Sequence, residues 1–468
     1  MLKTFLFDEL TPVALYGELK KIFKDEITML FESVVNTNDG NFSFIAIGAK
    51  ERITYKNEAT VYIDENRVSH NLNVNPFEFL KSYYTKIDKS EYIKKAELAG
   101  FSFTDGFIGF IGYDMVKIFE PVLKESMNNL KDTLNTPDLD LIRPKIIIGF
   151  SHKNSMLTII NNENSNDENI SKIENILKQS HMPTPLKKAN LKEGKLDIDE
   201  DRFKQLVDES KEHIRSGDLF QILISNRYTQ FGSVDRLSFY RLLRSKNPSP
   251  YLFLLEYEDF AICGSSPEVM IKLNDGDILL RPIAGTRKRG KERKRDIELE
   301  NEMLNDPKEC AEHLMLIDLG RNDVGRVAKT GSVKVTEMMR VERYSHVMHM
   351  VSDIEAKLAK DKDMFDLFMA TFTAGTMTGA PKIKAMELIA RFEKLKRGFY
   401  SGCVGYFAFN GNMDSAIAIR TALLQDDKVT LQAGAGVVAD SKPELEFLEV
   451  NNKLGALKAT LEELQNIQ

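Results

Sequence analysis

Two acidic segments carry glutamates at spacings that place several carboxylates on one face of a helix. In the first, Asp306 and Pro307 are residue types typical of a helix start, and Glu309 and Glu312 follow three residues apart. A purely structural role would make Glu309 the capping partner of Asp306 and Glu312 a solvated surface acid. The apolar run 314–317 favours instead a helix that faces a core.

The second acidic segment starts near Ser441, with Glu444 placed to complete a capping box. Glu446, Glu449 and Lys453 then fall on one stripe of the expected helix. A solvated face with one ion pair is the alternative explanation. The functional hypothesis is that one carboxylate from each acidic helix binds a hard cation, because magnesium prefers one or two carboxylates plus oxygens of water and substrate.

Three glycine-containing turns could present backbone N–H groups to an anion. They cover residues 282–287, 374–382 and 433–436, and none matches a Walker A loop or a dinucleotide fingerprint. Each turn alone is as consistent with an ordinary tight turn as with a binding site. Arg420 closes the apolar strand expected at 416–420, where a cation usually pairs with a buried or a bound carboxylate.

A pair of histidines adds candidates for acid–base chemistry. His346 and His349 lie three positions apart, close to a helical spacing. A histidine on such a face is more often a satisfied core residue than a catalyst. The pattern alone therefore leaves both roles open for each of them.

The elements that must position these residues divide the chain of 468 residues into three parts. Residues 1–160 are typical of mixed strands and short helices, and the polar stretch 161–198 is the expected linker. The domain expected at 199–468 begins with a helix that Asp199 caps and Gly217 stops. Strands and helices alternate irregularly after it, which favours an α+β fold over a doubly wound sheet.

Composition excludes several classes of protein. The net charge of −6 gives no electrostatic footprint for nucleic acid or an anionic membrane. The apolar runs are too short to span a bilayer, and the N-terminus lacks a sustained hydrophobic signal region. The three scattered cysteines (Cys263, Cys310 and Cys403) indicate reduced thiols without a disulfide framework or metal pair. We therefore expect a cytoplasmic protein with no nucleic-acid or membrane partner.

Together, the segments that hold these residues resemble the signature stretches of the chorismate-utilising enzyme family. The matching stretches are 282–287, 313–323, 374–382 and 434–453, in the family's order and approximate spacing. The resemblance covers about 200–460 strongly and 1–160 more weakly. It implies an α+β fold in which two large, mostly antiparallel sheets pack as a sandwich with helices outside.

The resemblance also implies a role for each candidate residue. Glu312 and Glu449 would bind Mg²⁺, which would hold the ring carboxylate of chorismate. Glu309 would be the general acid that helps the 4-hydroxyl leave, and His349 would assist the later loss of pyruvate. Two further catalytic candidates are Thr376 and Lys382. The implied substrate-binding residues are Gly285, Thr286, Tyr406, Arg420, Gly434, Ala435, Gly436 and Lys453.

Two positions distinguish the branches of this family. Aminodeoxychorismate synthases often carry a lysine that attacks the ring where this chain has Ala284, which cannot be a nucleophile. Isochorismate and salicylate synthases use a lysine to activate water where this chain has Gln221, which cannot be a base. A site without either lysine must receive a better nucleophile from outside, and ammonia fits.

The resemblance therefore implies the anthranilate synthase branch, in which chorismate and ammonia give anthranilate and pyruvate in the first committed step of tryptophan biosynthesis. The chain shows no glutaminase half, so a separate glutamine amidotransferase subunit would supply ammonia. The alternatives are an aminodeoxychorismate synthase subunit, a relative that stops at aminodeoxyisochorismate, and a catalytically silent regulatory module. The intact candidate residues argue against the last of these.

Two further segments, 30–33 and 247–251, resemble the family's tryptophan-binding element. The Glu32 carboxylate would bind the ammonium group of tryptophan and Ser33 its polar rim, while Pro250, Tyr251 and Leu252 would complete the pocket. The alternative is that Glu32 and Ser33 merely finish a strand. Since relatives can keep such a pocket around a permanently bound ligand, the pocket alone does not establish tryptophan as an inhibitor.

Overall fold

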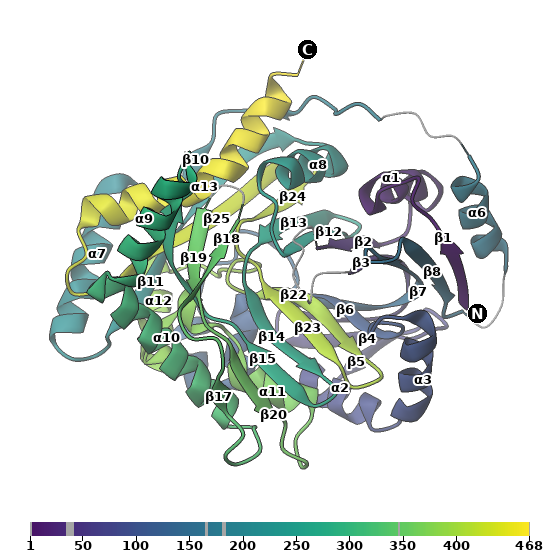
Figure 1. The fold of residues 1–468 in the computed structure, drawn as a ribbon, viewed down its shortest axis with the longest axis horizontal. Helices are drawn as coiled ribbons and strands as arrows, with labels where there is room; N and C mark the ends of the chain where they lie inside the picture. The colour runs from purple at the N-terminus through teal and green to yellow at the C-terminus, as the bar shows by residue number, and fades with distance from the viewer. Residues whose placement is uncertain (1, 34–41, 164–166, 180–183, 345–346, 468) are drawn as a thin grey trace.

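Two long strands, β3 (Phe42–Lys56) and β7 (Leu139–Ser151), pair with each other and belong to two sheet layers at once (Figure 1). Their pairing shifts register between Ala49 and Glu51, beside Gly48, whose φ of +69° suits glycine. Before this irregularity β3 pairs with β2, and after it β3 pairs with β4. The bend therefore carries the same two strands from one layer into the other. The computed structural model describes residues 2–33, 42–163, 167–179, 184–344 and 347–467.

The strands of each layer pair antiparallel. Layer A holds the first part of β3 and the last part of β7, together with β1 (Leu2–Leu6), β2 (Thr28–Glu32), β8 (Met156–Asn161), β9 (Asn190–Leu191), β10 (Lys195–Leu196), β11 (Gln221–Ser233), β12 (Tyr251–Glu256), β13 (Phe260–Ser266), β21 (Gly379–Ala380), β24 (Thr421–Gln425) and β25 (Lys428–Val437).

Layer B holds the remaining parts of β3 and β7, together with β4 (Ala59–Ile63), β5 (Ser69–Leu72), β6 (Gly106–Ile111), β14 (Val269–Asn274), β15 (Asp277–Leu280), β17 (Lys334–Val335), β20 (Ile354–Lys357), β22 (Cys403–Ala408) and β23 (Met413–Ile417). A separate small sheet consists of β16 (Ile283–Lys288), β19 (Val347–Val351) and β18 (Arg340–Arg343).

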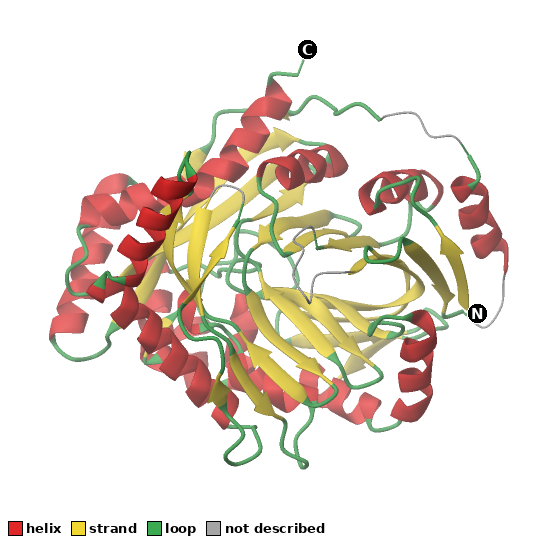
Figure 2. Ribbon diagram, in the orientation of Figure 1, coloured by secondary structure: helices red, strands yellow, loops and turns green. Residues whose placement is uncertain are grey.

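Helices lie outside the strands (Figure 2). They are α1 (Pro12–Ile22), α2 (Pro76–Tyr84), α3 (Lys89–Ala99), α4 (Val116–Phe119), α5 (Lys124–Met127), α6 (Asp167–Leu177), α7 (Glu200–Arg215), α8 (Arg236–Lys246), α9 (Arg293–Leu304), α10 (Pro307–Gly325), α11 (Met364–Thr371), α12 (Lys382–Glu393) and α13 (Pro443–Gln465). The short 3₁₀ turns of the described residues are η1 (Tyr113–Met115), η2 (Pro121–Leu123) and η3 (Gly375–Met377).

The period-two pattern of the strands divides the apolar side chains between two cores. Along β12, Leu252 and Leu254 pack into a core under α1, α7, α8, α12 and α13, on the outer side of layer A. Phe253 and Leu255 point the other way, into a central core shared with layer B. The two layers thus face each other, and the α+β prediction is confirmed. The two expected sheets are joined, because β3 and β7 run through both of them.

Three sequence predictions about local structure have clear outcomes. Asp199 caps α7 by accepting from the N–H of Arg202 at 2.8 Å, and Gly217 follows the helix with φ +84°, as predicted. The prediction that Ser441 caps the last helix was wrong, because α13 begins at Pro443 and no side chain caps it. The segment 161–198, expected as a linker, contains α6, and its role as a linker stays a prediction.

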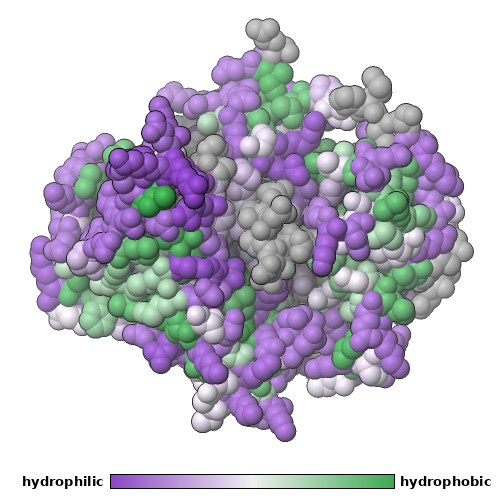
Figure 3. Space-filling view, in the orientation of Figure 1, coloured by the Kyte–Doolittle hydropathy of each residue, from purple (hydrophilic) through white to green (hydrophobic). Residues whose placement is uncertain are grey.

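The division into an N-terminal region and a C-terminal domain stays a prediction. Strands from both parts pair with each other, β2 with β12 and β6 with β22, so the two parts share one hydrogen-bonded network. Hydrophilic side chains cover most of the face in Figure 3, most densely over α9, beside the basic run 287–295. Among the helices that the structure describes, none is long and apolar enough to cross a membrane.

Candidate active site

The hairpin β16–β19 positions a histidine that can accept a proton. Thr286 lies opposite His349, and the His349 Nδ1 atom is 3.0 Å from Thr286 Oγ1 and 3.1 Å from the carbonyl oxygen of Gly285. Because a carbonyl oxygen can only accept, Nδ1 must donate the hydrogen in that contact, which leaves Nε2 as the free lone pair of a neutral ring. Within the described chain Nε2 is buried and has no hydrogen-bond partner.

Electrostatics keep this ring neutral. Burial, and then the nearby positive charge of Arg420, lower the pKa of His349 to about 4. At neutral pH the buried Nε2 atom is therefore an acceptor without a partner, which is what a general base needs. His346, the second histidine of the pattern, lies outside the described residues.

Helix α10 starts as its sequence predicts but uses its first glutamate differently. Asp306 Oδ1 accepts from the N–H groups of Lys308 and Glu309, and Pro307 occupies the first helical position. The Glu309 carboxylate does not complete a capping box, because its Oε1 atom lies 2.8 Å from Nη1 of Arg287. The Glu309 carboxylate and the Arg287 guanidinium therefore form an ion pair between α10 and β16. The predicted acid role of Glu309 is untested, and the structure offers a second candidate for it.

That second candidate is Glu268, which the sequence did not single out. Its side chain is 6% exposed and accepts a hydrogen bond from Thr376 Oγ1 at 2.9 Å and another from the N–H of Ile283. Burial raises the pKa of Glu268 to about 8, although these hydrogen bonds and the cations Lys453 and Arg420 act in the opposite direction. Glu268 is thus mostly protonated at neutral pH and can donate a proton.

Carboxylates of α10 and α13 converge, as the two acidic segments predicted. The pKa of Glu312 is raised by burial and then by the charges of Glu309, Glu446 and Glu449, while Lys308 lowers it. Burial and Glu449 likewise raise the pKa of Glu446. Repulsion among these groups is what a cation would relieve. The described residues form no group of three or more ligand types poised to hold a metal, so a cation here would rely on one or two carboxylates plus other oxygens.

The anion-binding candidates lie next to these carboxylates. Lys453 Nζ lies 2.7 Å from Glu449 Oε1 and donates to the carbonyl oxygen of Gly434 at 2.9 Å. Arg420 follows β23 rather than lying in it, with φ +49°. Burial lowers the pKa of Arg420, and Tyr344 and Glu268 partly offset this. The cations Arg420 and Lys453 both act on Glu268, so they face the same site.

The glycines of β25 make room for other side chains of the site. A Cβ atom on Gly434 would lie 2.9 Å from the carbonyl oxygen of Ile224 and 3.1 Å from the Tyr400 hydroxyl, and one on Gly436 would lie 2.6 Å from Nε2 of Gln221. Larger residues would displace these groups. Gln221 therefore lies against the glycine segment, and its Oε1 atom is buried with no partner among the described residues.

Two predicted site residues make other contacts in the structure. Tyr406, expected to bind substrate, lies on β22 with its ring 4.7 Å from that of Phe103, in the wall of a different cavity. Tyr400 is the tyrosine next to Gly434. Lys382, expected to be catalytic, donates to Asp323 Oδ2 at 2.7 Å and to the carbonyl oxygen of Thr371 at 3.2 Å.

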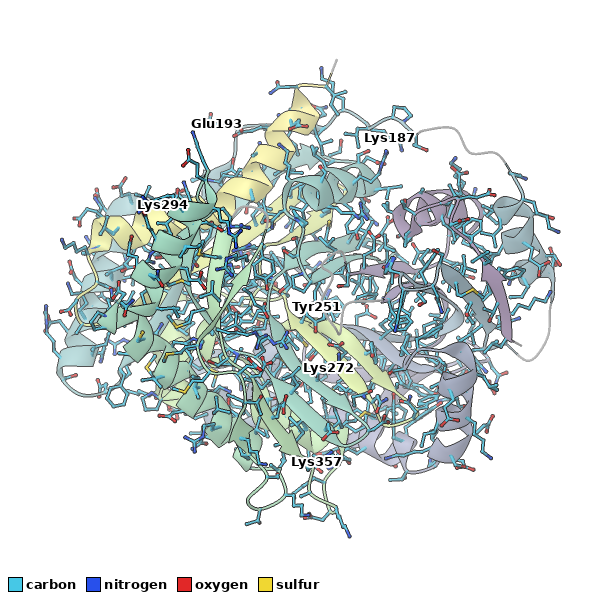
Figure 4. All side chains as sticks on the ribbon, in the orientation of Figure 1. Lys187, Glu193, Tyr251, Lys272, Lys294 and Lys357 are labelled. Carbon is cyan, nitrogen blue, oxygen red and sulfur yellow. The ribbon has the colours of Figure 1, made fainter. Side chains whose placement is uncertain are left out.

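A large cavity between the two sheet layers collects the residues expected to bind tryptophan. Its volume is about 1080 Å³, and its lining includes Glu32, Ser33, Pro250, Tyr251 and Leu252. Figure 4 shows Tyr251 near the middle of the molecule, above Lys272 of β14, which lines the same cavity. Tyr251 donates its hydroxyl hydrogen to Asp414 at 3.0 Å.

Glu32 uses only one of its two carboxylate oxygens in this arrangement. Its Oε2 atom accepts from the Tyr240 hydroxyl at 2.6 Å and from Arg244 Nε at 2.9 Å. Its Oε1 atom is buried and has no hydrogen-bond partner within the described ranges. A buried carboxylate oxygen without a partner suits a donor such as an ammonium group.

A family model described as chorismate binding enzyme matches residues 28–459. The chain belongs to the chorismate-binding enzyme family. Anthranilate synthase component 1 of Aquifex aeolicus is 38% identical over 471 residues, which cover 98% of this chain and 93% of that protein. The same component of Acinetobacter calcoaceticus is 39% identical over 472 residues, 98% of this chain and 94% of that protein.

Solved structures agree with this family membership. Anthranilate synthase component I from Streptococcus pneumoniae superposes with a TM-score of 0.78 at 33% identity, over 91% of this chain and 94% of that chain. The menaquinone-specific isochorismate synthase from Escherichia coli gives a TM-score of 0.72 at 19% identity, over 98% of this chain and 94% of that chain. The second likeness concerns the fold alone. This member of the chorismate-binding enzyme family is therefore an enzyme that uses chorismate.

Proposed function

We propose that this chain is the large subunit of an anthranilate synthase, which converts chorismate and ammonia to anthranilate, pyruvate and water. The observation that carries the proposal is a pair of buried groups whose pKa values move in opposite directions. Glu268 has a pKa raised to about 8, and His349 has one lowered to about 4. At neutral pH the site therefore holds an acid and a base together, which an amination followed by an elimination requires.

In the first step ammonia forms a bond to C2 of the ring while the C4–O bond breaks. Glu268 would donate the proton with which the 4-hydroxyl leaves as water, and Thr376 would orient its carboxyl group. In the second step Nε2 of His349 would remove the proton from C2 while the C3–O bond breaks and pyruvate leaves. Arg420, Lys453 and the N–H groups of 434–436 would bind the two carboxylates of chorismate.

Glu312 and Glu449 fit a magnesium ion, because both carboxylates face the same space and Glu446 adds charge to it. When bound, the ion would supply positive charge against a carboxylate of the substrate. Burial and the neighbouring carboxylates raise the pKa of Glu312, and a cation between Glu312 and Glu449 would offset that repulsion.

Ammonia is favoured over water or an enzyme nucleophile by two residues. Gln221 cannot activate water, and Ala284 cannot attack the ring. The buried Oε1 atom of Gln221, which has no partner among the described residues, can accept a hydrogen bond from ammonia. The relatives' designation as component 1 supports a separate component that supplies ammonia from glutamine. Tryptophan would act as feedback inhibitor in the cavity that contains Glu32.

The test is to incubate purified chain with chorismate, Mg²⁺ and ¹⁵N-ammonium and identify the products by mass spectrometry. The expected products are ¹⁵N-anthranilate and pyruvate in equal amounts, with no turnover when glutamine replaces ammonium. Aminodeoxychorismate as the end product would favour the aminodeoxychorismate synthase alternative, and aminodeoxyisochorismate would favour an enzyme that stops after amination. Isochorismate would contradict the proposal.

A further inference from the structure

A strongly basic segment runs from the end of β16 into the first turn of α9. Residues 287–295 hold seven arginines and lysines and a single carboxylate, Glu292, although the whole chain has a net charge of −6. The reaction steps above use none of these cations. The local charge therefore has the opposite sign to the charge of the chain as a whole.

Only part of this charge is neutralised within the fold. Arg287, Arg289 and Arg295 each form an ion pair with a carboxylate of α9 or α10. The other four cations are exposed and have no ion-pair partner within the described ranges. We call them the basic strip, which consists of Lys288, Lys291, Arg293 and Lys294.

The stability of α9 does not account for the cations at its start. The N-terminus of a helix carries partial positive charge, so acidic residues stabilise a first turn and basic residues destabilise it. Here Arg293 and Lys294 occupy the first two positions of α9, and no side chain caps the helix. These cations repel the helix end on which they lie, and they repel one another. A negatively charged molecule nearby would offset both effects.

The alternation of β16 places the start of the basic strip on the catalytic side of the hairpin β16–β19. Thr286 lies opposite His349, with its Oγ1 atom 3.0 Å from His349 Nδ1. Lys288 lies two residues, or about 7 Å, farther along the strand, so it projects from the same face as Thr286. Met348 projects from the other face, where it packs with Met303 of α9. Lys288 therefore lies on the face that bears His349 and not in the core under α9.

This edge of the hairpin is accessible to solvent. Thr286 is exposed, whereas the His349 side chain that it contacts is 4% exposed and holds a buried Nε2 atom without a partner among the described residues. Thr286 thus marks an accessible edge of the candidate active site, and Lys288 lies next to it. The surface over α9, where Figure 4 labels Lys294, is densely hydrophilic in Figure 3.

We propose that the basic strip attracts dianionic chorismate and guides it to this edge of the active site. The strip acts over a distance and does not hold the bound substrate, which Arg420 and Lys453 would bind. Attraction of this kind raises the rate of association by roughly 10- to 1,000-fold. It weakens as salt is added, because mobile ions screen exposed charges. The inference goes beyond the proposed function, since it needs only chorismate as the substrate and holds for each of the alternative products.

The test removes the four charges together, as Lys288→Gln, Lys291→Gln, Arg293→Gln and Lys294→Gln in one variant. At about 10 mM ionic strength, where the screening length is about 30 Å, kcat/KM for chorismate should fall at least tenfold below that of the wild type. At about 0.5 M, where the screening length is about 4 Å, the two proteins should agree within twofold. Both kcat and the KM for ammonia should stay within twofold throughout, because ammonia is neutral.

A matched control carries the same change in net charge far from the site. Four exposed lysines on or near α3 and β7 are replaced by glutamine, and α3 lies on the opposite side of the molecule from α9 (Figure 1). These four are Lys86, Lys89, Lys94 and Lys153. The control should keep the kcat/KM of the wild type within twofold at both ionic strengths. A control that loses as much as the strip variant would overturn the proposal, because net charge alone would then explain the effect.

Two further results would overturn the proposal. One is an unchanged kcat/KM in the strip variant at low ionic strength. The other is a loss of equal size at both ionic strengths, because local damage to the site does not depend on screening. If the fourfold variant does not fold, as judged by circular dichroism, Lys288→Gln and Lys291→Gln decide, since both residues precede α9 and each change should lower kcat/KM about two- to threefold at low ionic strength.

Failure of the basic strip and failure of the proposed function give different results. The rates are measured as loss of chorismate, whichever product forms. A wild type that consumes chorismate without making anthranilate would overturn the proposed function, while the dependence of its kcat/KM on salt and on the four charges would still decide the role of the strip.

Discussion

Thr376 donates its hydroxyl hydrogen to Glu268 Oε1 across 2.9 Å, which links the turn after α11 to the segment between β13 and β14 inside the candidate site. The hydrogen bond acts against burial, since it lowers the pKa of Glu268 whereas burial raises it. Thr376 is therefore a positioning residue that sets both the orientation and the acidity of Glu268. Its removal should be visible in the pH dependence of the reaction.

The pH profile of kcat/KM should reflect the titration of two buried groups, Glu268 and His349. Glu268 must be protonated to act, so activity should fall as the pH rises through about 8. His349 must be neutral, so activity should also fall as the pH drops through about 4.

Thr376→Val should move the upper limb of the pH profile to higher pH, because it removes a hydrogen bond that lowers the pKa of Glu268. Glu268→Gln should lose about 10²–10⁴-fold in kcat. An upper limb that stays in place in Thr376→Val would argue against Glu268 as its origin.

His349 should matter more for the elimination than for the amination. Its Nε2 atom is buried without a partner in the described structure, while Nδ1 is held by Gly285 and Thr286. In His349→Ala an aminated intermediate that still bears pyruvate should accumulate, and rapid quench with mass spectrometry should detect it. The exposed His70→Ala serves as the control. Equal slowing of both steps with no intermediate would assign His349 a structural role or an earlier one.

Magnesium should stabilise the folded chain through Glu312 and Glu449. A ligand present at 100 times its Kd contributes about 2.7 kcal/mol to the free energy of unfolding, so the Tm should rise with added Mg²⁺. Glu312→Gln and Glu449→Gln should abolish both this rise and turnover while the fold survives. Glu444→Gln, an exposed change on the same helix as Glu449, should keep both. A full Mg²⁺-dependent rise in Tm in the two site variants would place the ion elsewhere.

The sequence located the parts of this site that have local patterns. Asp306 and Pro307 start a helix by residue type alone, and the spacing of Glu446 and Glu449 follows from helical geometry, so both acidic helices could be predicted. Glu268 could not, because a single glutamate between two strands has no periodicity and its high pKa comes from burial among residues far away in the chain. The local sequence shows only that segment 265–268, which ends at Glu268, joins two apolar strands.

Tyr406 shows a different limit of the sequence. Tyr400 and Tyr406 are six residues apart near the same strand, and nothing local tells which one faces the glycines of β25. The pairing of β22 with β6 decides it, because this register turns Tyr406 toward Phe103 and the large cavity. The bend that joins the two sheets could not be predicted from the sequence either. It depends on the register shift that β3 and β7 share, and neither strand alone shows it.

Tryptophan should inhibit the enzyme by binding in the cavity lined by Glu32 and Ser33. Glu32 Oε1 can accept from the ammonium group of tryptophan, because Tyr240 and Arg244 occupy only Oε2. The cavity of about 1080 Å³ leaves room for an indole beside Pro250 and Tyr251. Ser33→Arg would place a long cation where the ammonium group should lie, so it should abolish inhibition and leave uninhibited turnover nearly intact. The exposed Ser69→Arg should remain inhibited.

Inhibition of this kind must also be reciprocal. Tryptophan can shift the enzyme only by binding its inactive arrangement more tightly than its active one. It should therefore weaken the binding of chorismate, and chorismate should weaken the binding of tryptophan by the same factor, which calorimetry with each ligand in the presence of the other can measure. If millimolar tryptophan leaves the activity of the wild type unchanged, the prediction is wrong, and the aminodeoxychorismate synthase alternative is favoured. Tight binding of tryptophan with no effect on chorismate would instead assign the cavity a structural ligand, because a ligand with equal affinity for both arrangements shifts neither.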